Sequence, residues 1–151
     1  MNKKIIFSGG GTGGHVLPAI NLMKHYFDKN YEVLLVTDRR GNKFIKNIYE
    51  YKSYILNTGT ITNQNILKKF FSTFLIFTSI IRSIFILKKE KPDLIFGFGG
   101  YVSFPICFAS VFLNYPLIIY ENNMVLGRSN KFLSLFSKKI FTAKDIRKSF
   151  I

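Results

Sequence analysis

The sequence has few acidic residues, a single cysteine and no Asp-x-Asp cluster. Asp and Glu total 8 against 22 Lys and Arg, which gives a formal net charge of +14. Such an excess favours an anionic partner, such as a phosphorylated ligand or an acidic membrane surface. One cysteine, Cys107, excludes an internal disulfide framework, and we expect it to be a small buried apolar residue in a reducing compartment. Because no Asp-x-Asp cluster is present, we expect no metal site.

Targeting and nucleic-acid motifs are missing as well. The N-terminal stretch MNKKIIFSGG has an apolar run that is short and meets glycines instead of a cleavage site, so we expect no secretory signal. No zinc-finger, basic-zipper or RNA-binding sheet signature is present, and we expect no nucleic-acid partner. The 151 residues are 48% hydrophobic and show no repeat or low-complexity linker. The chain is therefore expected to fold as one domain with a real core.

Apolar runs typical of buried strands alternate along the chain with segments of helical spacing. This order predicts an α/β fold, a Rossmann-like parallel sheet with helices on both faces. The expected strands are 4–8, 31–38, 51–57, one within 91–100, 115–121 and 138–143; the expected helices are 16–27, 65–89, 104–113 and 128–137.

The stretch FSGGGTGGHVLPAI, residues 7–20, has five glycines in six positions between the first expected strand and the first expected helix. Glycines let the backbone turn tightly and approach a ligand closely. The helix that follows would aim free N–H groups and a partial positive charge at the same place. Ligands of parallel sheets bind beyond the carboxyl ends of the strands, so the pattern predicts a phosphate or diphosphate site. A tight turn without a ligand is the alternative.

Gly9, Gly11 and Gly14 also match the dinucleotide fingerprint G-x-G-x-x-G. Asp38 ends the second expected strand, where such a fold places its ribose-binding acid, and the two arginines after it would hold a 2′-phosphate. An NAD(P)-binding Rossmann domain is therefore an alternative. Two features favour another ligand: the histidine beside the fingerprint, and a second glycine loop, GFGGYVSFP, at 97–105.

Three motifs in order carry a family resemblance: GGTGGHVLPA at 10–19, GFGGYVSFP at 97–105 and YENNMVLGRSNKFL at 120–133. Together they resemble the N-terminal half of the bacterial MurG glycosyltransferase family, glycosyltransferase family 28. The resemblance implies half of a GT-B fold, in which two Rossmann-like domains face each other across a cleft. It also implies transfer of GlcNAc from UDP-GlcNAc to lipid I, which makes lipid II for peptidoglycan at the cytoplasmic face of the cell membrane.

The chain departs from the family pattern in two motifs and in length. Tyr120 and Asn122 stand where the family usually has His and Gln, and Phe104 replaces a glycine of the second loop. The family's second domain, which supplies most nucleotide-sugar contacts, is not within residues 1–151. We therefore expect an acceptor-side domain that is weak or inactive without a complementary C-terminal half. A subunit of a split two-chain transferase, or a non-catalytic membrane-docked module that binds a lipid diphosphate, is the alternative.

The resemblance and the positions of the glycine loops assign candidate roles, and no cofactor is expected. His15 is the candidate general base, because imidazole titrates near working pH and a helix start favours its neutral form; positioning a phosphate is its other role. Glu121 would orient the acceptor, pair with a base or act only structurally. Asn130 would bind substrate or cap a helix. The expected substrate-binding residues are Thr12, Gly13, Gly14, Gly99, Gly100, Tyr101, Ser103, Asn123 and Asn130.

The segment ILKKFFSTFLIFTSIIRSIFILKK, residues 66–89, contains an apolar run of nearly membrane-spanning length with one arginine inside it. On a helical wheel one narrow polar stripe consists of Lys68, Ser72, Ser79 and Ser83. A core helix, an interfacial helix on an anionic membrane and a transmembrane helix are all open. The resemblance favours the interfacial helix, because the family docks on the inner membrane face to reach its lipid acceptor. The expected membrane contacts are Lys68, Lys69, Phe70, Phe71, Phe74, Lys88 and Lys89.

Overall fold

The computed structural model describes residues 2–45, 51–59 and 65–143, with only the backbone for 67–69. Six strands form one sheet in the order β3-β2-β1-β4-β5-β6, and every pairing is parallel. The strands are β1 (Lys4–Ser8), β2 (Glu32–Thr37), β3 (Lys52–Ile55), β4 (Leu94–Gly97), β5 (Leu117–Glu121) and β6 (Lys139–Thr142). The helices are α1 (Gly13–Phe27), the 3₁₀ helix η1 (Gly41–Ile45), α2 (Ile66–Glu90), α3 (Gly100–Phe112) and α4 (Arg128–Leu133).

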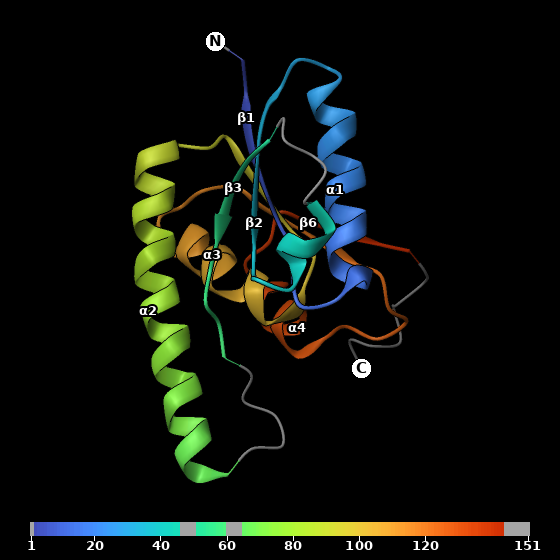
Figure 1. Ribbon diagram of the computed structural model, residues 1–151. Coiled ribbons are helices and arrows are strands. Elements are labelled where there is room, and N and C mark those ends of the chain that lie inside the picture. Colours follow the sequence, from blue (N-terminus) through green and yellow to red (C-terminus); the bar gives the residue numbers. More distant parts are fainter. Residues whose placement is uncertain (1, 46–50, 60–64, 144–151) are drawn as a thin grey trace.

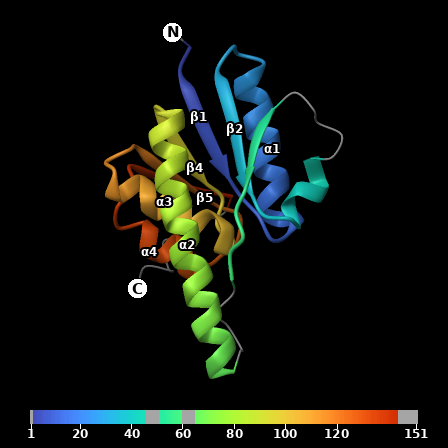
Figure 2. The ribbon, with the colours of Figure 1, turned by 60° about the vertical axis from the view of Figure 1, so that its left-hand side comes forward.

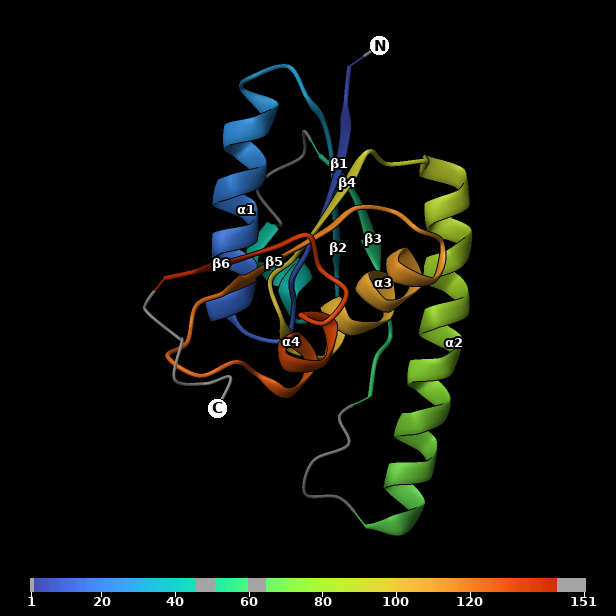
Figure 3. The ribbon, with the colours of Figure 1, turned by 180° about the vertical axis from the view of Figure 1, so that it is seen from behind.

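Helices cover both faces of the sheet, which confirms the predicted α/β architecture (Figure 1). Helix α1 lies on one face, whereas α2 and α3 lie on the other (Figure 3). The direction of the chain explains this division. The strands β1, β2 and β3 follow one another toward one edge of the sheet, and β4, β5 and β6 follow one another toward the other edge. Because the connections between parallel strands are right-handed, the helices of the first half and those of the second half lie on opposite faces.

Side chains that alternate along each strand divide the core into two layers. Ile5 and Phe7 of β1 pack in the layer beneath α1. Ile6, between them, packs in the layer that α2 and α3 cover. Because apolar side chains fill both faces, the central strands read as continuous apolar runs, and this is why the sequence predicts them well.

Two helices begin earlier than expected. Helix α1 starts at Gly13, and α3 starts at Gly100, so each glycine loop runs directly into the first turn of a helix. In α1 the amides of His15 and Val16 both donate to the carbonyl of Thr12, at 3.2 Å each. Helix α4, in contrast, ends at Leu133, four residues short of the expected end at 137.

The first glycine loop lies beside the second because their strands are neighbours. Ser8, the last residue of β1, pairs in register with Gly97, the last residue of β4. The order of strands reverses between β1 and β4, which is where open parallel sheets bind ligands. The fold therefore brings two loops, far apart in sequence, to one point at the carboxyl edge.

Helix α2 turns its serines toward the protein and its phenylalanines toward the outside. Ser72, Ser79 and Ser83 are buried, and Ser79 Oγ donates to the carbonyl of Asn57 at 2.8 Å. The first turns of α2 extend beyond the sheet (Figure 2). Its exposed large apolar residues are Ile66, Phe70, Phe71, Phe74, Phe77, Ile81 and Phe85.

A buried carboxylate fastens the end of α2 to the amino edge of the sheet. Glu90 is 4% exposed and accepts hydrogen bonds from Lys52 Nζ at 2.6 Å, Lys4 Nζ at 3.3 Å and the Tyr54 hydroxyl. Burial by itself raises the pKa of this carboxyl, but the three donors outweigh it and lower the pKa to about 2. Glu90 is therefore ionised at neutral pH and links β1, β3 and α2.

Candidate functional site

The two glycine loops touch so closely that side chains would not fit between them. A β-carbon on Gly10 would lie 2.5 Å from Val102 Cγ2, and one on Gly9 would lie 3.3 Å from Phe98 Cβ. Gly100, whose φ is +79°, lies against the carbonyl of Gly10 and the ring of His15, where a β-carbon would be 3.2 and 3.3 Å away. Several of the glycines thus serve the packing of one loop on the other.

Asp38 holds the first glycine loop in place. Its Oδ1 accepts from the amides of Gly11 at 3.0 Å and Gly41 at 2.7 Å, and its Oδ2 accepts from Arg40 Nε at 3.2 Å. Burial would raise the pKa of Asp38, but the two amides and the guanidinium lower it overall. With both oxygens occupied by the protein, Asp38 lacks the free carboxylate that a dinucleotide-binding domain directs at a ribose.

A polar cavity of about 350 Å³ opens where the two loops meet the segment after β5. His15 lies at its edge, and His15 Nδ1 is buried without a hydrogen-bond partner among the described residues. The lining consists of His15, Gly99, Gly100, Tyr101, Glu121, Asn123, Gly127, Arg128, Ser129 and Asn130. Residues from all three resemblance motifs therefore share one cavity.

Glu121 is 1% exposed and both of its oxygens are occupied. Oε1 accepts from the backbone and side-chain nitrogens of Asn123, both at 2.9 Å. Oε2 accepts from the amide of Gly127 at 3.0 Å and from Asn130 Nδ2 at 2.9 Å. The carboxylate thereby fixes the loop 122–127 and the start of α4 to the end of β5. These contacts are those of a structural residue.

Not every predicted substrate-binding residue reaches this cavity. Gly99, Gly100, Tyr101, Asn123 and Asn130 line it. Ser103 is fully buried, and its hydroxyl donates to the carbonyl of Ser8, which ties α3 to β1. The candidates outside the lining are Thr12, Gly13, Gly14 and Ser103.

Sequence reasoning gave Arg128 no role, although the structure places it in the lining. The available signal was its position directly after Gly127 in the third motif. Phe104, which replaces a family glycine, lies outside the lining and stacks on Phe108 with ring centroids 5.7 Å apart. Its ring also lies 6.0 Å from that of Phe132 in α4. The ring at position 104 therefore packs in the contact between α3 and α4, outside the cavity lining.

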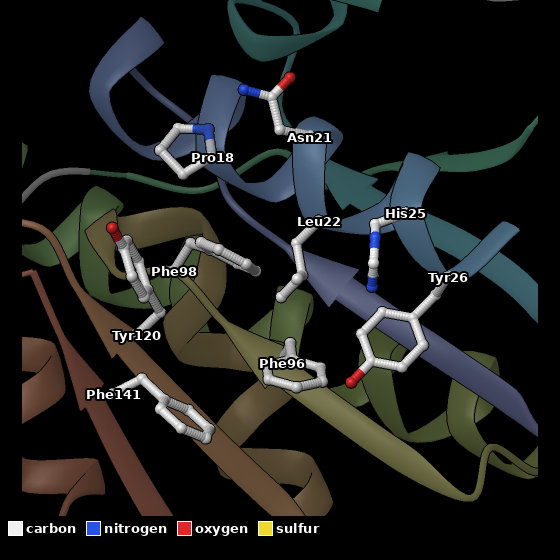
Figure 4. A pocket seen from close by; sticks show the side chains of 9 residues that line it. All are labelled: Pro18, Asn21, Leu22, His25, Tyr26, Phe96, Phe98, Tyr120 and Phe141. Carbon is white, nitrogen blue, oxygen red and sulfur yellow. The ribbon is translucent and has the colours of Figure 1, made fainter. Parts of the chain in front are cut away.

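A second, apolar hollow of about 520 Å³ lies on the α1 face of the sheet. In Figure 4, Leu22 and Tyr26 of α1 face Phe96 and Phe98 across the hollow. Tyr120, another departure from the family pattern, also lies here, with its ring 5.3 Å from Phe98. Tyr120 therefore points to the opposite face of the sheet from the buried Glu121 carboxylate. The full lining is Pro18, Asn21, Leu22, His25, Tyr26, Phe96, Phe98, Tyr120 and Phe141.

Helix α2 is long and apolar enough, by length and composition, to cross a membrane. The window within Phe70–Glu90 has a mean hydropathy of 2.0, and only 28% of it is buried. Within the described residues, α2 is therefore a surface helix. Phe70, Phe71 and Phe74 are exposed, as are Lys88 and Lys89. The side chains of Lys68 and Lys69 lie outside the described residues.

Comparison with known proteins agrees with this arrangement of motifs. The chain matches the glycosyltransferase family 28 N-terminal domain over residues 5–142. It is 43% identical over 150 residues to the UDP-N-acetylglucosamine--N-acetylmuramyl-(pentapeptide) pyrophosphoryl-undecaprenol N-acetylglucosamine transferase of Pelagibacter ubique, covering 99% of this chain and 41% of the relative. The enzyme of the same name from Staphylococcus aureus is 37% identical over 142 residues, with 92% and 40% covered. The chain thus spans less than half the length of these relatives.

Solved structures give the same result. Acinetobacter baumannii MurG superimposes with a TM-score of 0.84 at 28% identity, covering 95% of this chain and 42% of that one. Staphylococcus aureus MnaA, solved with UDP, shares the fold with a TM-score of 0.65 at 16% identity, covering 93% and 37%. These likenesses confirm the expected half of a GT-B fold and do not favour the dinucleotide-binding alternative. Since the family match extends over nearly the whole sheet, the chain belongs to glycosyltransferase family 28 and comprises its N-terminal domain.

Proposed function

We propose that residues 1–151 form the acceptor-side domain of an inverting transferase that moves GlcNAc from UDP-GlcNAc to lipid I. The product is lipid II, used in peptidoglycan synthesis. The names of the relatives from Pelagibacter ubique and Staphylococcus aureus describe this transfer and support the proposal. A complementary C-terminal half would supply the nucleotide-sugar site.

The observation that carries the proposal is the polar cavity between the two glycine loops. It adjoins the first turn of α3, which begins at Gly100, and His15 in the first turn of α1. Backbone N–H groups and the helix dipoles there would stabilise a diphosphate. An imidazole at the rim of an anion site is placed to accept the proton of an acceptor hydroxyl. His15 is the proposed base, and Gly99, Gly100, Tyr101, Asn123 and Asn130 are the proposed substrate contacts.

Docking of α2 on the cytoplasmic face of an anionic membrane is part of the same proposal. Because α2 follows β3, its exposed first turns and the carboxyl edge of the sheet lie at the same end of the molecule (Figure 1). Insertion of Phe70, Phe71 and Phe74 into the lipid interface would bring the cavity near a lipid-linked acceptor. With α2 lying along the membrane surface, Lys88 and Lys89, exposed at the other end of the helix, would contact the anionic headgroups.

Reconstitution tests the proposed function. Purified 1–151 is mixed with the C-terminal domain of the Pelagibacter ubique relative, and transfer of radiolabelled GlcNAc to lipid I in vesicles is measured. We expect little transfer with 1–151 alone and clear transfer with both parts. Full turnover by 1–151 alone would contradict the need for a second domain. Binding of lipid I by 1–151 without transfer in any mixture would instead favour the non-catalytic module.

A further inference from the structure

The lining of the polar cavity includes a cation, Arg128, whose charge no described residue neutralises. Apart from His15, the lining residues with formal charge are Glu121 and Arg128. Glu121 is buried and receives four N–H donors from Asn123, Gly127 and Asn130. Its charge is therefore compensated locally, and it makes no ion pair with the arginine.

Arg128 is exposed and has no hydrogen-bond or ion-pair partner among the described residues. Arg40, beside the first glycine loop, differs because Asp38 already holds it at 3.2 Å. A guanidinium offers five N–H donors in a planar fork that matches the oxygens of a phosphate. Arg128 thus has the chemistry and the freedom to bind an anion in the cavity.

A second observation, independent of charge, indicates a ligand at the same place. Asn130 is 2% exposed, and its Nδ2 donates to Glu121 Oε2 at 2.9 Å and to the Tyr120 carbonyl at 3.3 Å. Exchanging its amide nitrogen and oxygen would place an oxygen against the carboxylate, so the orientation is fixed. Asn130 Oδ1 is then a buried acceptor with no donor among the described residues. A ligand with a hydroxyl or amide N–H would satisfy it.

The segment that presents these groups is held rigidly before any ligand binds. The amide of Gly127 donates to Glu121 Oε2 at 3.0 Å, and the amide of Lys131 donates to the Gly127 carbonyl at 2.8 Å. The first turn of α4 is therefore anchored on the last residue of β5. An anchored turn loses little conformational freedom when its side chains bind a ligand.

We propose that Arg128 binds the diphosphate of the acceptor, while Asn130 Oδ1 accepts a hydrogen bond from the sugar attached to it. This inference rests on the proposed function and adds the residue that supplies positive charge. The ligand class is a sugar diphosphate, whose oxygens suit the guanidinium and whose hydroxyl or acetamido group suits the amide oxygen. Arg128 is a binding residue here and takes no part in proton transfer.

Calorimetric titration of 1–151 tests the proposal with two soluble probes, methylene diphosphonate and N-acetylglucosamine 1-diphosphate. Arg128→Gln should weaken binding of both probes by about tenfold or more, because a charge-assisted contact is lost. Arg128→Lys keeps the positive charge but loses the planar fork of donors. Its affinity for the probes should therefore lie between that of the wild type and that of Arg128→Gln. Lys131→Gln removes an equal charge from the same helix outside the lining and should change affinity by less than about twofold.

The outcomes separate the inference from the proposed function. If the wild type binds and Arg128→Gln binds equally well, the assignment of Arg128 is wrong while the diphosphate site stands. Equal loss in Arg128→Gln and Lys131→Gln would mean general electrostatic attraction and would also overturn it. No binding by the wild type would reject both proposals. Only N-acetylglucosamine 1-diphosphate carries a sugar. If the wild type binds both probes with equal affinity, the proposed contact between Asn130 Oδ1 and the sugar is wrong. Unchanged circular dichroism and thermal midpoints show that the exposed substitutions leave the fold intact.

Discussion

Gly10 of the first glycine loop lies directly against Val102 of α3, where a β-carbon on Gly10 would come within 2.5 Å of Val102 Cγ2. Gly10→Ala should therefore destabilise the protein by about 1–3 kcal/mol through overpacking. Val102→Ala removes the two Cγ contacts but keeps Val102 Cβ, 2.7 Å from the added β-carbon. It should therefore restore only part of the stability in the double variant, with a coupling energy of about 0.5–3 kcal/mol. Urea unfolding of the four proteins measures this. Gly14→Ala is the matched control, because its β-carbon would meet only Thr12 Oγ1, at 3.8 Å. Additive effects of Gly10→Ala and Val102→Ala would contradict the contact.

Glu90 should make the free energy of unfolding depend on pH in the acidic range. Its folded pKa of about 2 lies below the ordinary value of 4.5, so its contribution is complete above pH 4.5 and is lost as pH falls toward 2. Glu90→Gln should cost about 3 kcal/mol of unfolding free energy at pH 7. The difference from wild type should shrink toward zero near pH 2. Glu32→Gln removes only an exposed partner of Lys4 and should cost about 0.5 kcal/mol or less. A constant Glu90→Gln difference from pH 7 to 2 would refute the linkage.

Glu121 is expected to stabilise the segment 122–130 and not to take part in the reaction. Glu121→Gln replaces one accepting oxygen with an N–H group facing donors from Asn123, Gly127 or Asn130. The variant should lose about 1.5–3 kcal/mol of stability. Amide hydrogen exchange should accelerate across 122–130, and transfer in the reconstituted enzyme should fall with it. Loss of transfer with stability and exchange unchanged would point instead to direct contact with the reacting groups.

Substitution of His15 should affect the rate of transfer much more than the affinity for a diphosphate. In the reconstituted enzyme, His15→Ala should lower kcat by about 10²–10⁴-fold if the imidazole accepts the acceptor proton. The affinity of 1–151 for methylene diphosphonate should change far less. His25→Ala, on the same helix but in the apolar hollow, is the control and should leave kcat near wild type. A kcat unchanged by His15→Ala, with weaker acceptor binding, would move His15 to a positioning role.

The exposed face of α2 should control vesicle binding. Phe74→Ser with Phe77→Ser should reduce binding to anionic vesicles by about a hundredfold or more, since each buried ring contributes roughly 1.5–3 kcal/mol. Lys88→Gln with Lys89→Gln should weaken it by about tenfold or more, at roughly 1 kcal/mol per charge. Phe141→Ser, on the α1 face, is the control. Co-sedimentation measures binding, and a carbonate wash follows. Retention through the wash would mean a spanning helix, and no binding by wild type would reject docking.

The sequence predicted the sheet well because periodicity and burial agree in it. Strands such as β1, at Lys4–Ser8, are apolar runs that could bury both faces, and the predicted bounds match. Helix starts were less predictable, because glycine has low helix propensity and yet Gly13 and Gly100 begin α1 and α3. At Gly100 the contact with Gly10 and His15 of the other loop outweighs local preference.

The site was only partly predictable, because its residues depend on partners far away in sequence. The motifs pointed to Gly99, Asn123 and Asn130, which do line the cavity. They could not show that the Ser103 hydroxyl turns inward to Ser8, 95 residues away. Nor could they show that Asp38 would be occupied by Gly11 and Gly41. A motif identifies which residues come together, whereas packing decides which of their atoms stay free.

The inward serines of α2 have a consequence for how the protein tolerates a change of solvent. Ser79 fastens the helix to the loop after β3 with a hydrogen bond to the Asn57 carbonyl, and Ser83 bonds to Ser79 within the helix. Close to α2, a β-carbon on Gly59 would lie 2.7 Å from Ser72 Cα, so the two backbones nearly touch. This attachment combines directed bonds and close backbone contact with the burial of Ile86 and Leu87 in the core, all on the inner side of the helix. It should therefore hold equally well whether the outer phenylalanines face water or acyl chains.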